Sequence, residues 1–431
     1  MPTRTDTFIE RLDEQVLAIA QACTACGACA EVCPTVPLTI DDELVTPAEL
    51  TAGVRDILRG HEAPGTSQTW ARTCCSSGAC LAACDHGINP RFMLTMARRA
   101  MNQFIKPETR RADGKAAFQK MSRGVKIISR LTSPPELLER LSPRSHPDHQ
   151  SAPDIIFYTG CNMLKTPHIG LLCLDVMDRL GVSYDVQGGP GACCGILQTR
   201  PGDMENAGRQ AFTTLDNFAA SGTSKIVSWC PTCQIQFGET IIPAYQSITG
   251  TRLDITMFPV YLADQMDALR EHLTIPVKKR VAIYEYAGEL GVMEAVRALL
   301  GAIPELEIVE IETSSIGYNN TSLAPLGRYH QDTMMAALDE AEASNVDTFV
   351  GVYHGDHRAF AGHEAARSFA VANYMELVGE SMGIAVADRF KQLKLMQDAD
   401  AIVAASIDQI DTFGLDPETV RDVVATDMLA E

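Results

Sequence analysis

The sequence lacks the patterns by which several large classes of protein are recognised. No apolar run approaches the roughly 18 residues of a transmembrane helix, and acidic residues near the start replace the apolar stretch of a signal peptide. Basic residues are outnumbered, 36 against 55 acidic ones, which argues against nucleic acid as a partner. No G-x-G-x-x-G fingerprint, P-loop or Ser/His/Asp signature is present. The sequence therefore predicts a cytoplasmic protein without a nicotinamide or flavin site of its own.

Cysteine, by contrast, is plentiful and unevenly distributed. The chain has 14 cysteines in 431 residues, too many for packing alone and too few for a disulfide scaffold of this length. Only Cys173, in an apolar run, stands apart as an expected core thiol. The other cysteines form three groups: Cys23, Cys26, Cys29 and Cys33; Cys74, Cys75, Cys80 and Cys84; and Cys161, Cys193, Cys194, Cys230 and Cys233. In a reducing compartment such grouping indicates bound metal.

The first group has the spacing Cys-x2-Cys-x2-Cys-x3-Cys-Pro, starting at Cys23. Three closely spaced thiolates can converge on one iron–sulfur cube while the fourth, beyond a short turn, points to a neighbouring cluster. Zinc needs only four thiolates and usually takes them from two separated pairs. The spacing therefore predicts iron–sulfur clusters.

The second group nearly repeats the first. When CTACGACAEVCP and CCSSGACLAACD are aligned by Gly27 and Gly78, Ser77 stands where the first group has its second cysteine, Cys26. The resulting C-x5-C-x3-C run, from Cys74, resembles the iron–sulfur subunit of succinate dehydrogenases and fumarate reductases, where it helps to hold a three-iron cluster.

That resemblance implies two clusters, each of which takes cysteines from both motifs. A three-thiolate site favours [3Fe–4S], because the missing ligand leaves one iron corner unsupported. A second [4Fe–4S] is the alternative, with Cys75 or Ser77 as the fourth ligand, and Cys75 is otherwise a buried bystander. The implied ligands are Cys23, Cys26, Cys29 and Cys84 for a first [4Fe–4S], and Cys33, Cys74 and Cys80 for the second cluster.

The third group follows three predicted strands, in YTGC, GGPGACCG and SWCPTC. Loops after parallel strands emerge at one edge of a sheet, so the five sulfurs can gather there. The spacing resembles the cysteine-rich "CCG" domain of heterodisulfide reductases, and the preceding region resembles a second, separate polypeptide of the same enzymes. The fused arrangement resembles thiol:fumarate reductase iron–sulfur subunits and, more loosely, those of glycolate oxidases.

In the heterodisulfide reductase family the five cysteines of one motif hold a non-cubane [4Fe–4S] cluster. A site with an extra thiolate can break or make disulfides, which makes Cys193 and Cys194 candidate catalytic residues. An ordinary cubane on four of Cys161, Cys193, Cys194, Cys230 and Cys233 is one alternative, and zinc is another.

The strand pattern predicts a duplication. Strands at 154–160, 182–188 and 224–229 recur after about 126, 124 and 122 residues, which indicates a repeated α/β unit. The predicted fold class is α plus α/β, with a helical two-cluster ferredoxin-like domain followed by two tandem α/β CCG-type domains, the second lacking cysteines. The predicted parts are a ferredoxin-like domain at 1–105, a basic helix and linker at 106–153, a CCG domain at 154–276 and a degenerate CCG-like domain at 277–431.

The last domain departs from the family pattern. It has Ala287 in YEYAG, no cysteine pair in SSIGYNN, and VYHGDHRAF in place of SWCPTCQIQF. The resembling reductases have a pair of such clusters, and the second cluster of that pair cannot form here. His354 and His357 lie near the position of the missing pair and are candidate metal or substrate ligands. Further candidates beside them are Glu285, Tyr286, Tyr353 and Asp356. The alternative is a degenerate loop whose polar residues serve packing or a partner.

The segment 91–150 is basic, with a net charge of +8 in a chain of net charge −19. Within it, Phe118, Met121, Val125 and Ile128 share one side of a predicted helix. Such a basic amphipathic helix can lie on an anionic membrane surface, and peripheral attachment to the inner membrane is then expected. The alternative is a helix packed on its own protein or on an acidic subunit.

These features predict an iron–sulfur electron-transfer subunit of a hetero-oligomeric oxidoreductase. A flavoprotein dehydrogenase subunit is the expected partner, because the chain has no flavin site of its own, and the acceptor is a quinone, a disulfide or another carrier. Two alternatives remain: a catalytic reductase of disulfide or thiol-bound substrates at the five-cysteine site, and a quinone-reducing peripheral membrane subunit.

Overall fold

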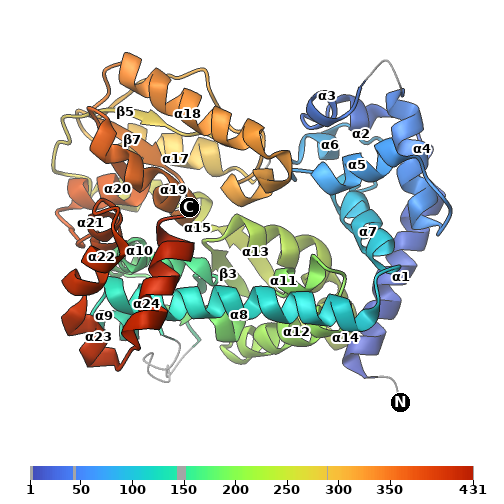
Figure 1. The fold of residues 1–431 in the computed structure, drawn as a ribbon, viewed down its shortest axis with the longest axis horizontal. Helices are drawn as coiled ribbons and strands as arrows, with labels where there is room; N and C mark the ends of the chain where they lie inside the picture. The colour runs from blue at the N-terminus through green and yellow to red at the C-terminus, as the bar shows by residue number, and fades with distance from the viewer. Residues whose placement is uncertain (1–2, 42–44, 143–151, 289, 431) are drawn as a thin grey trace.

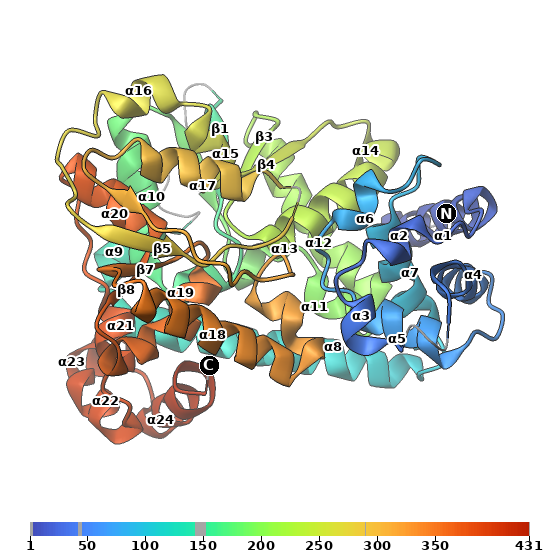
Figure 2. The same ribbon diagram turned by 90° about the horizontal axis from the view of Figure 1, so that it is seen from above.

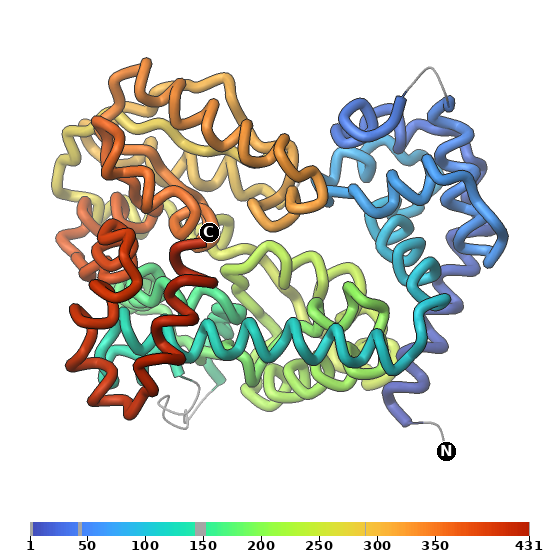
Figure 3. The backbone as a smooth tube through the Cα atoms, viewed as in Figure 1, coloured from blue at the N-terminus to red at the C-terminus, as the bar shows by residue number. Residues whose placement is uncertain are grey.

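The computed structural model describes residues 3–41, 45–142, 152–288 and 290–430. Residues 143–151 of the expected basic helix and linker (106–153) therefore lie outside the described residues. An N-terminal helical part, a first α/β unit and a last α/β unit are arranged around one long helix, α8 (Pro107–Thr132), which crosses the molecule (Figures 1 and 3).

The N-terminal part is entirely helical within the described residues. Its first helix starts at a capping box in which Thr3 and Asp6 bond each other's backbone N–H groups, and it buries Phe8 and Leu12. Phe8 packs on Gly208 of the first α/β unit, where a side chain on the glycine would clash with the ring. The helices are α1 (Arg4–Ala22), α2 (Ala28–Glu31), α3 (Val36–Thr39), α4 (Pro47–Leu58), α5 (Gly65–Thr73), α6 (Ala79–Ala82) and α7 (Pro90–Asn102).

The first α/β unit contains a four-stranded parallel sheet of order β2-β1-β3-β4. Its strands are β1 (Ile155–Tyr158), β2 (Tyr184–Gln187), β3 (Lys225–Ser228) and β4 (Asp254–Met257). Its helices are η2 (Asn162–Lys165), α10 (Pro167–Arg179), η3 (Pro190–Ala192), α11 (Ile196–Thr199), α12 (Met204–Ala220), α13 (Pro231–Ile235), η4 (Gln236–Ile241), α14 (Ile242–Thr249), α15 (Phe258–Ala263) and α16 (Met266–Arg270).

The last α/β unit contains a second parallel sheet of matching order, β6-β5-β7-β8. Its strands are β5 (Arg280–Ile283), β6 (Glu307–Ile308), β7 (Thr348–Gly351) and β8 (Ala370–Asn373). Its helices are α17 (Val292–Gly301), η5 (Asn320–Leu326), α18 (Arg328–Ala343), α19 (His354–Phe360), η6 (Ala361–Ala366), α20 (Tyr374–Met382), α21 (Arg389–Lys394), α22 (Ala399–Ala405), α23 (Ile407–Phe413), α24 (Pro417–Val423) and η7 (Val424–Met428).

All six strands expected from the sequence are present, and each unit has one further strand. The two extra strands, β4 and β8, lie at the sheet edges, and each exposes its first residue, Asp254 or Ala370. The two sheets share one continuous core, to which Phe157 and Trp229 contribute from the first unit and Tyr284 and Phe349 from the last. Figure 2 shows the last unit lying over the first, with the N-terminal part at the opposite end of α8.

The apolar side of α8 is covered by the chain itself. Its Ile127, Ile128 and Leu131 belong to a buried cluster with the helices of the C-terminal end, and Met121 and Val125 are buried as well. Arg123 forms an ion pair with Asp422, with 2.8 Å between Nη2 and Oδ2. Packing against its own protein is thus the observed arrangement of this helix. Among the described residues, no helix is long and apolar enough to cross a membrane.

The helix α9 (Pro135–Arg140) follows α8 and leads towards the first sheet. Arg140 on this helix bonds Asp175 and Asp178 of α10. Each sheet is parallel, so all its strands end at one edge. In the first sheet, the third cysteine group follows these strand ends.

Candidate iron–sulfur sites

The five cysteines of the third group line one cavity of about 120 Å³. Cys161 follows β1, the pair Cys193 and Cys194 follows β2, and Cys230 and Cys233 follow β3. The Sγ atoms of Cys194 and Cys233 lie 3.4 Å apart, although the two residues come from different loops. The edge of the first sheet therefore gathers all five sulfurs, as the strand pattern predicted.

Two glycines allow these loops to approach each other closely. Gly160 has φ +67°, and a Cβ at this position would lie 3.0 Å from the Cβ of Cys230. Gly195, directly after the cysteine pair, has φ +81°, and its Cβ would lie 2.6 Å from the carbonyl oxygen of Ala207. Both positions need a residue that has no side chain and tolerates positive φ.

Buried hydrogen bonds hold the loop of the cysteine pair to the first sheet and to α12. The Tyr158 hydroxyl, fully buried on β1, donates to the carbonyl of Ala192 at 2.7 Å and lies 3.8 Å from the Sγ of Cys233. Thr214 of α12 donates to the carbonyl of Cys193 at 3.1 Å. The sulfurs are thus attached to rigid elements, as a cluster site requires.

The thiols also interact with one another. Hydrogen bonding with Cys161 and Cys194 holds the pKa of Cys193 below its usual range, while the same contact with Cys193, together with burial, raises the pKa of Cys161. Hydrogen bonding with Cys233 likewise lowers the pKa of Cys230. Thiols packed this closely share protons, and a positive metal centre can replace those protons.

The last α/β unit forms the opposite wall of this cavity, with Asn319, Asn320, Thr321, Tyr353, His354, Gly355 and Arg358. Asn319 donates through its amide to the hydroxyl of Thr232 on α13 at 3.0 Å, and the Tyr318 hydroxyl lies 3.2 Å from the same oxygen. The indole N–H of Trp229 donates to Nδ1 of His354 at 3.2 Å. The cysteine-free unit therefore closes the five-cysteine site.

The cysteines predicted for the first cluster lie together in the N-terminal part. One small cavity there is lined by Cys23, Cys26, Cys29 and Cys84. Thr51 of α4 lies 3.7 Å from the sulfur of Cys29, and burial raises the pKa of this thiol to about 11. Such a thiol remains protonated at neutral pH unless a cation compensates the thiolate.

A second small cavity is lined by the cysteines predicted for the other cluster, Cys33, Cys74 and Cys80. Trp70 donates its indole N–H to the sulfur of Cys33 at 3.3 Å. Cys29 lines this cavity as well as the first one, so the two candidate sites are neighbours.

The two N-terminal motifs have the same local backbone geometry. Ala25 and Ser76 have φ angles of 59° and 57°, and the glycines that follow two residues later, Gly27 and Gly78, have φ angles of 91° and 86°. Positive φ is unusual for alanine and serine, so this match supports the alignment that sets Ser77 at the position of the second cysteine.

Cys75 lines the second cavity, but its thiol also has a bond elsewhere. It donates to the carbonyl of Ile316 in the last unit at 3.3 Å, and burial raises its pKa to about 12. Ser77 lines the same cavity and its hydroxyl accepts from the N–H of Ala79.

One buried ion pair connects the second N-terminal cavity with the first α/β unit. Arg91, at the start of α7, donates to the carbonyl of Ser76 at 3.2 Å and through Nε to Glu239 at 3.0 Å. Glu239 belongs to η4, which follows directly on the helix that carries Cys233. The sequence offered no signal for this pair, because the two residues are single charges 148 positions apart.

The two predicted histidines lie in different places. His354 lines the five-cysteine cavity, whereas His357 bonds Asp388 in a separate buried cluster with His168 and Glu376. The further candidates are also separated from one another. Tyr353 lines the five-cysteine cavity, Glu285 pairs with Arg297, and the Tyr286 hydroxyl lies within hydrogen-bonding distance of Asp356 and Asn320.

The donor sets fit iron–sulfur clusters. Among the described residues, four cysteines line the first cavity, five line the second (Cys33, Cys74 and Cys80 with Cys29 and Cys75) and five line the third. None of these cysteines forms a disulfide. Clustered thiolate sulfur is the ligand type that iron–sulfur clusters require. Cys173, outside the three groups, is fully buried in the core as expected.

Comparisons with known families agree with these sites. A 4Fe–4S dicluster domain matches residues 22–89, and a cysteine-rich domain (CCG) matches residues 155–238. These matches contain the first two cysteine groups and the third group, respectively. They confirm the domain resemblances predicted from the cysteine spacing and support iron–sulfur clusters as cofactors.

Three characterised proteins are similar along much of the chain. The glycolate oxidase iron–sulfur subunit of Escherichia coli is 21% identical over 85% of this chain and 95% of its own length. One subunit of the fumarate reductase (CoM/CoB) of Methanothermobacter marburgensis is 25% identical over 67% of this chain, which spans only 46% of that relative. One subunit of the dihydromethanophenazine:CoB–CoM heterodisulfide reductase of Methanosarcina mazei is 23% identical over 68% of this chain and 75% of its own length. All three are named as subunits of oxidoreductases, which confirms the expected resemblance.

Proposed function

We propose that this chain is the iron–sulfur electron-transfer subunit of a multi-subunit oxidoreductase, which relays electrons between a flavoprotein dehydrogenase subunit and an acceptor. The relatives named as oxidoreductase subunits and the two matched domains support an electron-transfer role. A flavoprotein is the proposed donor because the sequence has no flavin or nicotinamide motif of its own.

The proposed domains are 1–105, 106–153, 154–276 and 277–431, the last being a CCG-like unit that has lost its cysteines. We assign [4Fe–4S] to the first site, [3Fe–4S] to the second and a five-thiolate [4Fe–4S] to the third. The proposed ligands are Cys23, Cys26, Cys29 and Cys84; Cys33, Cys74 and Cys80; and Cys161, Cys193, Cys194, Cys230 and Cys233.

The observation that carries this proposal is the succession of three thiol-lined cavities. The first two share Cys29, and the second is linked through Arg91 and Glu239 to the helical segment that follows Cys233. When bound, iron–sulfur clusters take up and release single electrons, and their potentials respond to hydrogen bonds and to burial. The residues of the chain fix the spacing of the sites.

Specific side chains perform this positioning. Trp70 donates to the sulfur of Cys33, and Tyr158 lies beside the sulfur of Cys233. Donors to a thiolate sulfur stabilise the reduced, more negative state of a cluster site and thereby raise its potential. Ile316, which accepts from Cys75, and Asn319, which bonds Thr232, are three residues apart. The short segment 316–319 therefore contacts both the second and the third site.

The proposal is tested by purifying the chain without oxygen and measuring iron, sulfide and electron paramagnetic resonance spectra during a redox titration. Three separable one-electron centres are expected, with a three-iron signal in the oxidised protein. A colourless protein that contains zinc but no iron contradicts the proposal. Co-purification of a flavin-containing subunit identifies the donor.

A second function, reduction of a disulfide or thiol-bound substrate at the five-cysteine site, is favoured by two cationic side chains. Arg200 and Arg358 line the cavity beside the five cysteines. Cationic side chains there suit an anionic substrate. Replacing Cys193 with alanine abolishes activity if this site is the catalytic one, and only slows turnover if it is a relay.

A quinone-reducing subunit at the inner membrane surface is less well supported. On the apolar side of α8, which would face the membrane, Met121, Val125 and Ile128 are buried within the chain, and Ile128 packs with the C-terminal helices. The proposed location is therefore the cytoplasm, in a hetero-oligomeric complex.

A further inference from the structure

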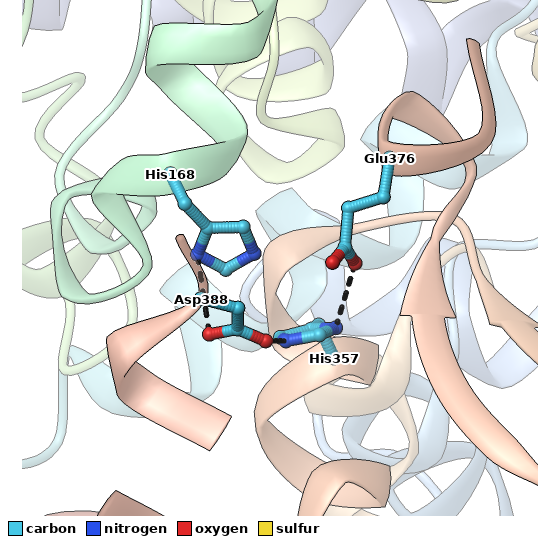
Figure 4. Close-up of side chains that lie close together, drawn as sticks. All are labelled: His168, His357, Glu376 and Asp388. Carbon is cyan, nitrogen blue, oxygen red and sulfur yellow. Dashed lines mark hydrogen bonds and ion pairs between the residues drawn. The ribbon is translucent and has the colours of Figure 1, made fainter. Parts of the chain in front are cut away.

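A second group of metal-ligating side chains lies away from the cysteines. His168, His357, Glu376 and Asp388 each offer one ligand atom, and these four atoms all lie within 4.8 Å of one another. Figure 4 shows the four side chains converging from α10, α19, α20 and the segment that precedes α21. One residue comes from the first α/β unit and three from the last.

Both imidazoles are buried and each has an unused nitrogen. His168 is 2% exposed and His357 is 0% exposed. Among the described residues, Nε2 of His168 and Nδ1 of His357 have no hydrogen-bond partner. Buried polar atoms are usually paired with protein groups, water or an ion, so these two nitrogens indicate a missing ligand.

Asp388 holds the opposite edges of the two rings. One of its oxygens lies 2.6 Å from Nε2 of His357, and the other lies 3.4 Å from Nδ1 of His168. The unused nitrogens consequently face the carboxylate of Glu376, as Figure 4 shows. A carboxylate that bonds one imidazole nitrogen while the other nitrogen binds a metal is a common arrangement at zinc sites.

We propose that this cluster is a zinc site, with His168 Nε2, His357 Nδ1 and the Glu376 carboxylate as ligands and Asp388 as the residue that orients both rings. Imidazole nitrogen with carboxylate oxygen suits Zn²⁺, whereas Mg²⁺ and Ca²⁺ select oxygen alone. Iron–sulfur clusters require thiolates, and this group of four side chains contains no cysteine.

The spacing needs little adjustment. Nδ1 of His357 lies 3.8 Å from Oε2 of Glu376. Two ligand atoms about 2.0 Å from a tetrahedral zinc ion are roughly 3.3 Å apart, so this pair of ligand atoms moves about half an ångström closer on binding. Glu376 also accepts from the N–H of Asn373 at 2.6 Å, which fixes its carboxylate at the start of α20.

The position of the site gives zinc a structural consequence. The metal joins α10 of the first unit to α19 of the last, and α19 also carries His354 and Arg358, which line the five-cysteine cavity. Bound zinc therefore fixes the last unit over the five-cysteine site.

The test uses the full-length protein purified without oxygen, with zinc measured by mass spectrometry apart from cluster iron. We expect one zinc per chain and a zinc K-edge absorption spectrum with nitrogen and oxygen neighbours near 2.0 Å and no sulfur near 2.3 Å. His168→Ala and Glu376→Gln lose the zinc and keep the iron. His363→Ala, a histidine of the last unit outside the cluster, keeps both.

Asp388→Asn provides a milder test if the alanine variant fails to fold. Loss of an orienting carboxylate weakens zinc binding by about 10–100-fold, as measured by competition with a chelator. Sulfur neighbours in the absorption spectrum, iron in place of zinc in a nitrogen and oxygen site, or zinc retained by both His168→Ala and Glu376→Gln overturns the proposal.

Discussion

Replacing Gly195 with alanine tests whether the backbone of the cysteine-pair loop is essential for the third cluster. Gly195 has φ +81°, and an added Cβ would lie 2.6 Å from the carbonyl oxygen of Ala207, closer than side-chain carbons approach backbone atoms. Because that oxygen belongs to α12, it cannot rotate away as a flexible side chain could. The loop must move instead, and Cys194 is the residue directly before it.

Two costs add at this position. Holding alanine in the left-handed region costs about 1–2 kcal/mol. Forcing a methyl group against fixed backbone costs a further ~1–3 kcal/mol. Gly250→Ala is the matched control, because Gly250 has φ +74° in the same unit but no atom within 4 Å of an added Cβ. The control therefore bears only the first cost, and the difference between the variants measures the clash.

The assay is iron content together with thermal unfolding of the protein purified without oxygen. Gly195→Ala is expected to lose about four irons per chain while the signals of the two N-terminal clusters remain. Gly250→Ala is expected to keep all of its iron and to unfold at a temperature between those of the parent and Gly195→Ala. If Gly195→Ala keeps the third cluster and melts like Gly250→Ala, the argument that close loop approach builds this site is refuted.

Three further substitutions examine the other sites. Ser77→Cys is expected to convert the three-iron signal of the oxidised protein into a four-iron signal that appears on reduction. The neighbouring variant Ser76→Cys is expected to leave the three-iron signal unchanged. A four-iron cluster already present in the parent protein would contradict the three-thiolate assignment. Arg91→Gln leaves Glu239 without its ion-pair partner and is expected to lower the free energy of unfolding by about 3–5 kcal/mol. The double variant Arg91→Gln/Glu239→Gln is expected to restore much of that free energy. Equal losses of unfolding free energy in the single and double variants would show that the pair does not couple. Tyr158→Phe removes the hydrogen bond to Ala192 and is expected to lower the free energy of unfolding by about 1 kcal/mol. It is also expected to lower the reduction potential of the third cluster without changing the signals of the N-terminal clusters. An unchanged potential would show that Tyr158 does not influence this cluster.

The sequence was most informative where several residues of one type recur at short spacing. Cys23, Cys26 and Cys29 lie within seven residues, so local backbone geometry alone brings their sulfurs together. The third group was predictable for another reason, because parallel strands end at one edge and bring their loops with them. Of the six predicted strands, β1, β3, β5 and β7 are the inner strands of the two sheets, and β2 and β6 pair with β1 and β5.

Contacts made by single residues could not be predicted in this way. His168 and Asp388 are 220 positions apart, and neither belongs to a pattern. The role of the segment around Asn319 was hidden as well, because polar residues in a loop without cysteines are equally compatible with solvent. The edge strands β4 and β8 were not predicted from the sequence. The apolar side of α8 was recognised, but its partners lie almost 300 residues further along the chain.

The wall that the last unit contributes to the five-cysteine cavity is covalently part of the chain. A separate protein in that place would dissociate on dilution, whereas a tethered one is present at a high and constant effective concentration. Each five-cysteine site therefore has one such wall in fixed stoichiometry, independent of expression level. Exposure of the cysteines on this side then depends on local opening of the loop around Asn319, so it is set by the local folding stability of that loop.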